Sequence, residues 1–310
     1  MTIAPFLIKS ARIGWKWEWN QLMNRLAPSD KDGNYQRPLS QHQEALLLSE
    51  ISINKRPNNQ LPILFVGRSC PWAHRTWLVY EMRNLAKNLN LIITKANHQK
   101  GRWEIEPAWR SCNTLLNVYE LCGSPPTHRA TVPTIIDPGE NYSDNPKIIG
   151  NESAQLVEVL SKWPTNNSTN DLHLFPNNLR EEIFQWHQLL QPSVNDGVYR
   201  CGFARNQNAY NKACKELFEA LEIVEESLQS KGPWLCGKTL TIADIRLFPT
   251  LIRWEIVYEP LFKCNLKPLS HFKNICKWRQ KFFSIPKVDK TCNSNAWRED
   301  YFGALFPLNP

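Results

Sequence analysis

The sequence predicts an α/β domain followed by an all-helical domain. Within residues 61–163, apolar runs of strand length alternate with segments of helical periodicity, whereas beyond residue 178 only helical periodicity occurs. Between them, residues 164–178 hold two prolines and five asparagines, a composition typical of a linker. We therefore expect an N-terminal extension at 1–60, an α/β domain at 61–163, the linker at 164–178 and a helical domain at 179–310.

The α/β domain begins with LPILFV at residues 61–66, a short apolar run that predicts a buried strand. Pro71 suits the first turn of the helix that should follow, because its missing N–H costs nothing there. The order of the expected elements is that of a thioredoxin-type domain. After that helix come a strand at 91–94, a helix near 115–121, strands at 132–136 and 147–149, and a helix starting near residue 151 or 153.

The helical domain is predicted by one long apolar stripe and one marked helix start. Five apolar residues share a helix face, at positions 213, 217, 221, 224 and 228. Thr241 and Asp244 have the spacing of a capping box, with Leu240 and Ile245 placed to form a hydrophobic staple. We interpret Asp244 as structural and expect a helical bundle.

Composition excludes several classes of protein. With 42% hydrophobic residues the chain is too apolar to be disordered, and no apolar run approaches the ~20 residues that a membrane span needs. The net charge is +8, and residues 263–290 carry eight basic residues and one acidic residue with aromatic residues interleaved. This stretch could bind nucleic acid, but we favour an amphipathic helix with a lysine-rich solvated face.

Cysteine usage and the N-terminus indicate where the protein resides. The nine cysteines are odd in number, irregularly spaced and without a Cys-x-x-Cys pair, which fits a reducing compartment. Residues 1–30 lack an apolar core followed by a small-residue cleavage site, so we expect a retained N-terminus and a cytoplasmic protein. A transit peptide stays open, because Glu18 is the only acidic residue before Asp30.

Cys70 is the main catalytic candidate. It lies between a predicted strand and a predicted helix, where unpaired N–H groups and the helix dipole favour a thiolate. Ala73 stands where a dithiol motif has its second cysteine, so Cys70 can form a mixed disulfide that a second, soluble thiol must resolve. His74 follows on the same helix, but no second Cys/His pair of suitable spacing completes a metal site, and we expect none.

Two further segments suit the binding of glutathione. Val132-Pro133, if the bond is cis, would expose the Val132 backbone to an extended peptide. Glu152 and Ser153 open a helix directly after a strand, offering N–H groups to a carboxylate and a carboxylate to an ammonium. Each segment can also be read as an ordinary turn or cap.

Beyond single residues, six strings of the sequence fit a family pattern. They resemble the glutathionyl-hydroquinone reductases, the xi class of the glutathione transferases, from about Arg37 to the C-terminus. The resemblance implies a thioredoxin-like domain, a helical domain, a homodimer, and reduction of glutathionyl-hydroquinones with glutathione as co-substrate. The strings are SCPWAHRTW (69–77), RATVPTIID (129–137), NESAQ (151–155), NDGVYRCGFA (195–204), LTIADIRLFPTLIRWEIVY (240–258) and FKCN (262–265).

The resemblance also assigns roles to individual residues. It makes Cys70 the nucleophile and places Tyr199 and Tyr301 against the hydroquinone. This sequence departs from the pattern at Asp196, where asparagine is usual, at Phe302, where tyrosine is common, and in residues 110–127, which lack the family's usual glycine-containing motif. The residues implied to hold glutathione are Trp103, Arg129, Val132, Glu152 and Ser153.

Two other functions stay open at this point. A general cysteine-type transferase, acting on glutathionylated proteins or dehydroascorbate, would need Cys70 but not the two tyrosines. A non-catalytic protein could use residues 263–290 to bind nucleic acid, with affinity that depends on salt. The sequence does not identify the quinone or the role of residues 1–36, where Trp15, Trp17 and Trp19 cluster.

Overall fold

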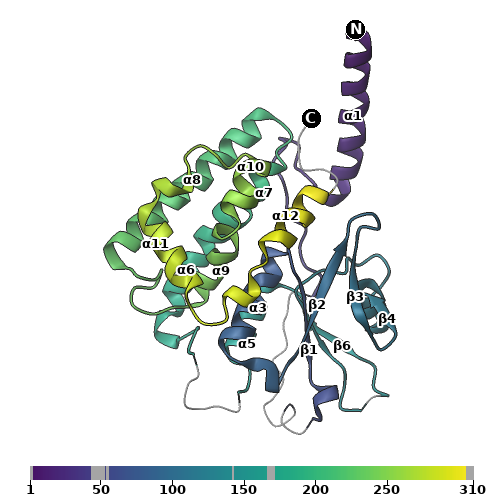
Figure 1. The fold of residues 1–310 in the computed structure, drawn as a ribbon, viewed down its shortest axis with the longest axis vertical. Coiled ribbons are helices and arrows are strands. Elements are labelled where there is room, and N and C mark those ends of the chain that lie inside the picture. Colours follow the sequence, from purple (N-terminus) through teal and green to yellow (C-terminus); the bar gives the residue numbers. More distant parts are fainter. Residues whose placement is uncertain (1–2, 43–52, 54–55, 142, 166–171, 305–310) are drawn as a thin grey trace.

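In the computed structural model a six-stranded sheet lies beside a group of helices, and one long helix projects from their junction (Figure 1). The structure describes residues 3–42, 53, 56–141, 143–165 and 172–304. The predicted N-terminal extension and linker fall partly outside these residues. The division into domains at 61–163 and 179–310 therefore remains our proposal.

The sheet has the strand order β4-β3-β2-β1-β5-β6. β1 and β2 pair in parallel, joined by α3 (Pro71–Met82), and the other pairs are antiparallel. This is the expected βαβ unit followed by a hairpin. The strands are β1 (Ile63–Gly67), β2 (Asn90–Asn97), β3 (Arg102–Trp109), β4 (Cys112–Thr114), β5 (Thr134–Asp137) and β6 (Lys147–Gly150).

Two strands lie where the sequence analysis placed none. β3 and β4 form a hairpin in the segment for which only a helix was expected, and that helix is present as α4 (Leu115–Leu121). The signal was the alternation of Trp103, Ile105 and Trp109 with charged residues. Pro107 obscured it, because proline cannot donate to a sheet and argues against a strand.

The remaining helix of the α/β part, α5 (Ser153–Ser161), contacts both α3 and α9. A single cluster of buried apolar side chains runs from the sheet through these helices into the helical part. The two parts therefore share one core, which fixes α3 between them.

Beyond residue 172 the described chain contains helices and no strand of the sheet. The apolar stripe predicted for residues 213–228 is buried along α8, and the capping box at Thr241 is present at the start of α9. The elements are α6 (Arg180–Leu190), a π-helical turn (Gln191–Asn195), α7 (Gly197–Gly202), α8 (Gln207–Lys231), α9 (Ile242–Leu251), a second π-helical turn (Trp254–Tyr258), α10 (Glu259–Phe262), α11 (Lys273–Phe283) and α12 (Ser294–Gly303).

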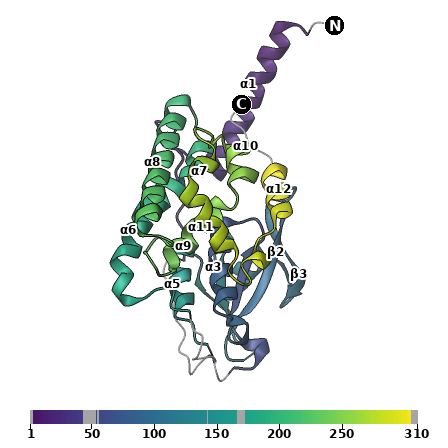
Figure 2. The same ribbon diagram turned by 60° about the vertical axis from the view of Figure 1, so that its left-hand side comes forward.

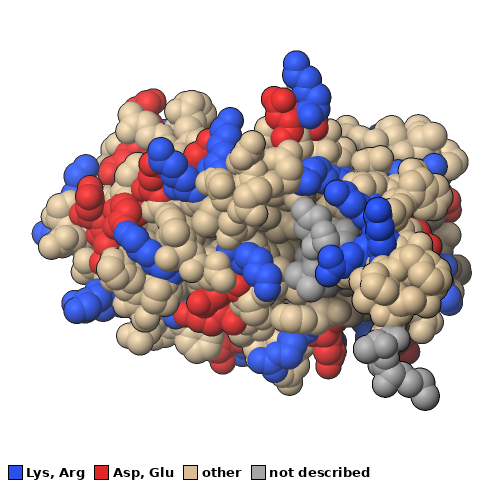
Figure 3. Space-filling model, turned by 90° about the horizontal axis from the view of Figure 1, so that it is seen from above, with Lys and Arg blue, Asp and Glu red and all other residues tan. Residues whose placement is uncertain are grey.

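The basic stretch at 263–290 contains α11, an amphipathic helix. Trp278 and Phe282 are buried in the core, whereas Phe283 is exposed. Two of the three aromatic side chains that suggested stacking on nucleic-acid bases are thus unavailable for it. On the left of the face seen in Figure 3, basic and acidic side chains are interspersed, whereas several basic side chains lie together right of centre.

The first helix, α1 (Pro5–Leu26), extends well beyond the rest of the molecule in both ribbon views (Figures 1 and 2). Only Trp19 and Met23 of this helix are buried. None of the helices in the described ranges is long and apolar enough to cross a membrane.

Candidate active site

Cys70 stands at the junction of β1 and α3, as expected, and forms the N-cap of α3. Its Sγ lies 3.5 Å from the backbone N of Ala73, which donates to it, and 3.4 Å from the carbonyl O of Val132. Burial raises the pKa of the Cys70 thiol, while the N–H groups of Ala73 and Trp72 and the charge of Arg253 act in the opposite direction. The helix N-terminus thus supplies the expected contact, but burial outweighs it and the pKa of the thiol is raised.

Two hollows meet at Cys70. The first, of about 570 Å³, we call the polar pocket, and the second, of about 670 Å³, the aromatic pocket. Cys70, Trp72 and Trp103 line both. A group bound in either pocket therefore has access to the same sulfur atom.

The polar pocket contains four of the residues predicted to bind glutathione. They lie on β3, on the segment before β5 and at the start of α5, and they are Trp103, Arg129, Val132 and Ser153. The Val132-Pro133 bond is cis. The ring of Trp103 packs directly over Gly67, where an added Cβ would lie 2.6 Å from the indole. Glycine at position 67 therefore leaves room for the indole over the end of β1.

Glu152 adjoins this pocket as the N-cap of α5. Its carboxylate accepts hydrogen bonds from the Ala154 backbone N–H at 3.2 Å and from the Ser40 hydroxyl at 2.8 Å, and Arg37 lies 3.6 Å away. Burial works to raise the pKa of Glu152, but these three partners outweigh it and the pKa is lowered. Glu152 is therefore a carboxylate at neutral pH.

Arg37 is a site residue that the sequence analysis did not identify. Its guanidinium lies over the indole of Trp72, 3.9 Å from the ring centroid, and 3.6 Å from carboxylate oxygens of both Glu152 and Asp196. Asp196, where the family pattern usually has asparagine, thereby gains an ionic partner, and it also accepts a hydrogen bond from Gln191. Nothing in the local sequence pattern marked Arg37, since its partners are far away along the chain.

The aromatic pocket contains both predicted tyrosines, and their hydroxyl oxygens lie 2.6 Å apart. Tyr258, which the sequence analysis did not single out, adds a third hydroxyl 3.3 Å from that of Tyr301. Burial raises the pKa of Tyr199 and of Tyr301, so both hydroxyls keep their protons and can donate. Tyr199 and Tyr301 thus line the pocket, and the Tyr258 hydroxyl, outside that lining, contacts both of theirs. Tyr258 is fully buried, and its sequence position is indistinguishable from that of a core tyrosine.

A buried arginine links α3 to α12 beneath the thiol. Arg253 Nη1 lies 2.8 Å from Nδ1 of His74, and the guanidinium stacks over Trp297 at 4.2 Å. His74 Nε2 contacts the Thr291 hydroxyl at 2.7 Å, and burial holds the pKa of His74 well below 6.5. His74 is therefore a neutral link in the core. Within the described parts of the chain, no group of three or more His, Cys, Asp or Glu side chains could hold a metal ion.

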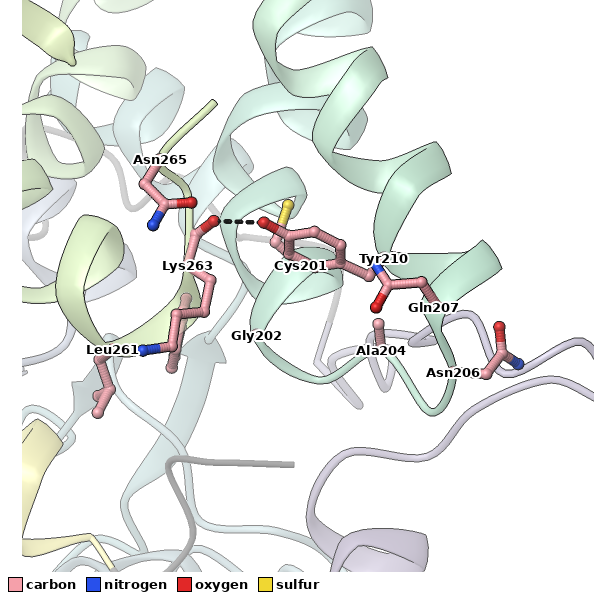
Figure 4. A pocket seen from close by; sticks show the side chains of 10 residues that line it. Cys201, Gly202, Ala204, Asn206, Gln207, Tyr210, Leu261, Lys263 and Asn265 are labelled. Carbon is pink, nitrogen blue, oxygen red and sulfur yellow. Dashed lines mark hydrogen bonds between the residues drawn. The ribbon is translucent and has the colours of Figure 1, made fainter. Parts of the chain in front are cut away.

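A third hollow, of about 440 Å³, is lined by residues of α7, α8 and α10 (Figure 4). There the Tyr210 hydroxyl donates a hydrogen bond to the Lys263 carbonyl at 2.7 Å. None of the predicted site residues lines it, so the candidate site is confined to the polar and aromatic pockets.

Comparison with known proteins identifies the family. The glutathionyl-hydroquinone reductase PcpF of Sphingobium chlorophenolicum is 31% identical over 80% of this chain and 79% of its own length. This chain belongs to the glutathionyl-hydroquinone reductases, the xi class of glutathione transferases. The reductase YqjG of Escherichia coli is 29% identical over 80% of this chain and 76% of its own length. The family described as "Glutathione S-transferase, C-terminal domain" matches residues 182–286.

Solved structures agree with this family. The xi glutathione transferase of Phanerochaete chrysosporium superposes with a TM-score of 0.76 at 26% identity, covering 91% of this chain and 94% of that one. The glutathione-bound structure of YqjG gives a TM-score of 0.71 at 27% identity, covering 78% and 80%. The predicted fold, a thioredoxin-like part followed by a helical part, is confirmed. The protein is an enzyme of the glutathione-dependent type.

Proposed function

We propose that this reductase converts glutathionyl-hydroquinones to hydroquinones, with a second glutathione as the reductant. The observation that supports the proposal is the shared position of Cys70, between a polar pocket suited to a peptide and an aromatic pocket that presents tyrosine hydroxyls. A general thiol transferase requires the first pocket. A hydroquinone reductase requires both.

In the polar pocket, Glu152 would accept the ammonium of glutathione in place of Arg37, and the backbone of Val132 would pair with the peptide. Ser153 and the N–H groups at the start of α5 would face a carboxylate, because a helix N-terminus attracts anions. Trp103 and Arg129 would cover the ligand.

Breaking the carbon–sulfur bond of the substrate requires a change in the aromatic ring, which the aromatic pocket must promote. Attack at sulfur while the ring is aromatic would expel an aryl carbanion, so the ring must first take a keto form. Tyr199 and Tyr301 would hydrogen-bond the ring oxygens and move the proton. The Cys70 thiol then gives up its proton and its sulfur bonds to the glutathionyl sulfur. The carbon–sulfur electron pair passes to the ring, and the enolate that leaves becomes hydroquinone on taking up a proton.

The second half-reaction restores the enzyme. A glutathione thiolate attacks the glutathionyl sulfur of the mixed disulfide, releasing glutathione disulfide and the Cys70 thiolate. All nine cysteines are free, and Ala73 replaces the thiol that could resolve the intermediate internally. A homodimer and a cytoplasmic location remain predictions from the sequence.

The test measures consumption of glutathionyl-menadiol with excess glutathione, alongside reduction of a glutathionylated peptide disulfide. Cys70→Ala should abolish both activities. Should the wild-type protein reduce only the disulfide, the general transferase would be the correct function. Binding to glutathione resin that salt alone reverses would favour the nucleic-acid hypothesis instead.

A further inference from the structure

The last turns of α1 are attached to the body of the enzyme by a small apolar cluster of their own. Trp19, Met23 and Ala27 are each 2% exposed, and they pack with Tyr35 and Phe203 apart from the main core. Large apolar side chains nearer the N-terminus, such as Phe6 and Trp17, are exposed. The helix is thus fixed at one end and free along the rest of its length (Figures 1 and 2).

Polar contacts fix the same end to the loop after α7. The Arg205 guanidinium stacks over Trp19 at 4.5 Å and donates to the Ala27 carbonyl at 3.1 Å. The Arg205 backbone N–H donates to the Gly33 carbonyl at 3.0 Å. Because α7 carries Tyr199, these contacts hold the end of α1 in a defined position relative to the reactive groups.

This fixed end of α1 forms part of the aromatic pocket. Leu22, Met23, Leu26 and Ala27 line it, and the ring of Phe203 connects them to the tyrosines, with its centroid 6.0 Å from that of Tyr199. Leu22 and Leu26 are 41% and 53% exposed. A ligand that covered these leucines would remove apolar surface from water, which is favourable.

The chemistry at the other side of the pocket limits how a substrate can lie. Its sulfur must reach Cys70 and its ring oxygens must reach the hydroxyls of Tyr199 and Tyr301, which leaves the other ring edges to the apolar lining. On the proposed function, we infer that Leu22 of α1 is a specificity-determining residue that favours hydroquinones with a fused second ring or a bulky apolar substituent. Within residues 1–36, whose role the sequence did not identify, Leu22 would thus contribute to substrate specificity.

Leu22 is the best position for a test. Its side chain is outside the cluster that anchors α1, and it lines the aromatic pocket but not the polar pocket. Leu26 lines both pockets, and Met23 is an anchor, so neither separates the two effects. Leu7, 52% exposed on the free part of the same helix, provides a matched control.

The experiment compares Leu22→Ala and Leu7→Ala on three substrates: glutathionyl-menadiol with two fused rings, glutathionyl-benzohydroquinone with one, and a glutathionylated peptide disulfide with none. Leu22→Ala should lower kcat/KM about tenfold for the bicyclic substrate, through KM, and less than about twofold for the other two. Leu7→Ala should change none of them. Equal losses on all three substrates, or no loss on any, would overturn the inference.

A binding measurement separates this inference from the proposed function. Titration calorimetry with 1-naphthol and phenol needs no turnover. If the wild type reduces no glutathionyl-hydroquinone, the proposed function fails, and the role of Leu22 is then decided by binding alone. Leu22→Ala should weaken naphthol binding at least fivefold more than phenol binding, and equal effects on the two ligands would contradict it.

Discussion

Replacing Tyr301 by phenylalanine removes one oxygen atom from the aromatic pocket and leaves the ring in place. The oxygen lies 2.6 Å from the Tyr199 hydroxyl and 3.3 Å from that of Tyr258. Its loss therefore removes one donor to the ring oxygen of the substrate. Loss of one donor to a developing oxyanion costs about 2.7–4 kcal/mol, or about 10²–10³ in kcat.

We therefore expect Tyr301→Phe and Tyr199→Phe each to lower kcat on glutathionyl-menadiol by about 100-fold. Tyr258→Phe should cost about tenfold or less, because Tyr258 does not line the pocket and acts only through the hydroxyls of Tyr199 and Tyr301. Turnover is followed by chromatography of the released hydroquinone at saturating substrate. Tyr210→Phe is the matched control, since its hydroxyl bonds the Lys263 carbonyl outside the aromatic pocket.

Reduction of a glutathionylated peptide disulfide shows whether a tyrosine variant has lost stabilisation of the ring oxygen or has a disturbed active site. That reaction expels a thiolate and develops no charge on a ring oxygen, so the tyrosine variants should keep it within about threefold. If Tyr301→Phe lost both activities to the same extent, or kept full activity on glutathionyl-menadiol, the hydroxyls would have no role in stabilising the ring oxygen.

Three further predictions follow from buried polar groups. Arg253→Met removes a charge that lowers the pKa of the Cys70 thiol, so the pH midpoint of Cys70 alkylation by iodoacetamide should rise by about half to one pH unit. Arg253→Lys should shift the midpoint less. Equal midpoints in the wild type and Arg253→Met would exclude an effect of Arg253 on the thiol. Asp244→Ala should lower the free energy of unfolding, measured in urea, by about 3 kcal/mol, because the Leu235 and Thr241 N–H groups and the Trp278 indole lose their acceptor. A loss below about 1 kcal/mol would contradict the structural role of Asp244. His74 stays neutral when folded but takes a proton at about pH 6.5 when unfolded, so stability should fall below that pH by up to about 1.4 kcal/mol per pH unit, and His74→Asn should reduce this slope.

The parts of the site that could be predicted are those defined by local sequence. Cys70 follows an apolar run and precedes a proline at a helix start, and Thr241 precedes Asp244 at capping-box spacing. In each case the deciding contacts are within a few residues. The local sequence was therefore enough to predict the candidate nucleophile and the structural carboxylate.

Other site residues act through contacts between distant parts of the chain. Arg37 forms ion pairs with residues 152 and 196. Tyr258 contacts Tyr301, and Arg253 contacts Trp297, only when α12 packs against the second π-helical turn. No spacing in the sequence encodes these approaches. Tyr199 and Tyr301 were found only through the family resemblance, since each alone resembles an ordinary partly buried tyrosine.

The aromatic pocket is lined by residues of both α1 and α12, the first and the last helix of the described residues. A protein still on the ribosome can complete its sheet and place Cys70 at the start of α3 before Tyr301 has been added. A carboxypeptidase that trimmed the chain past residue 301 would return it to that state. On the proposed function, such a product should still exchange disulfides at Cys70 while no longer acting on the aromatic substrate, so loss of Tyr301 and the residues after it would change the reaction while leaving the thiol in place.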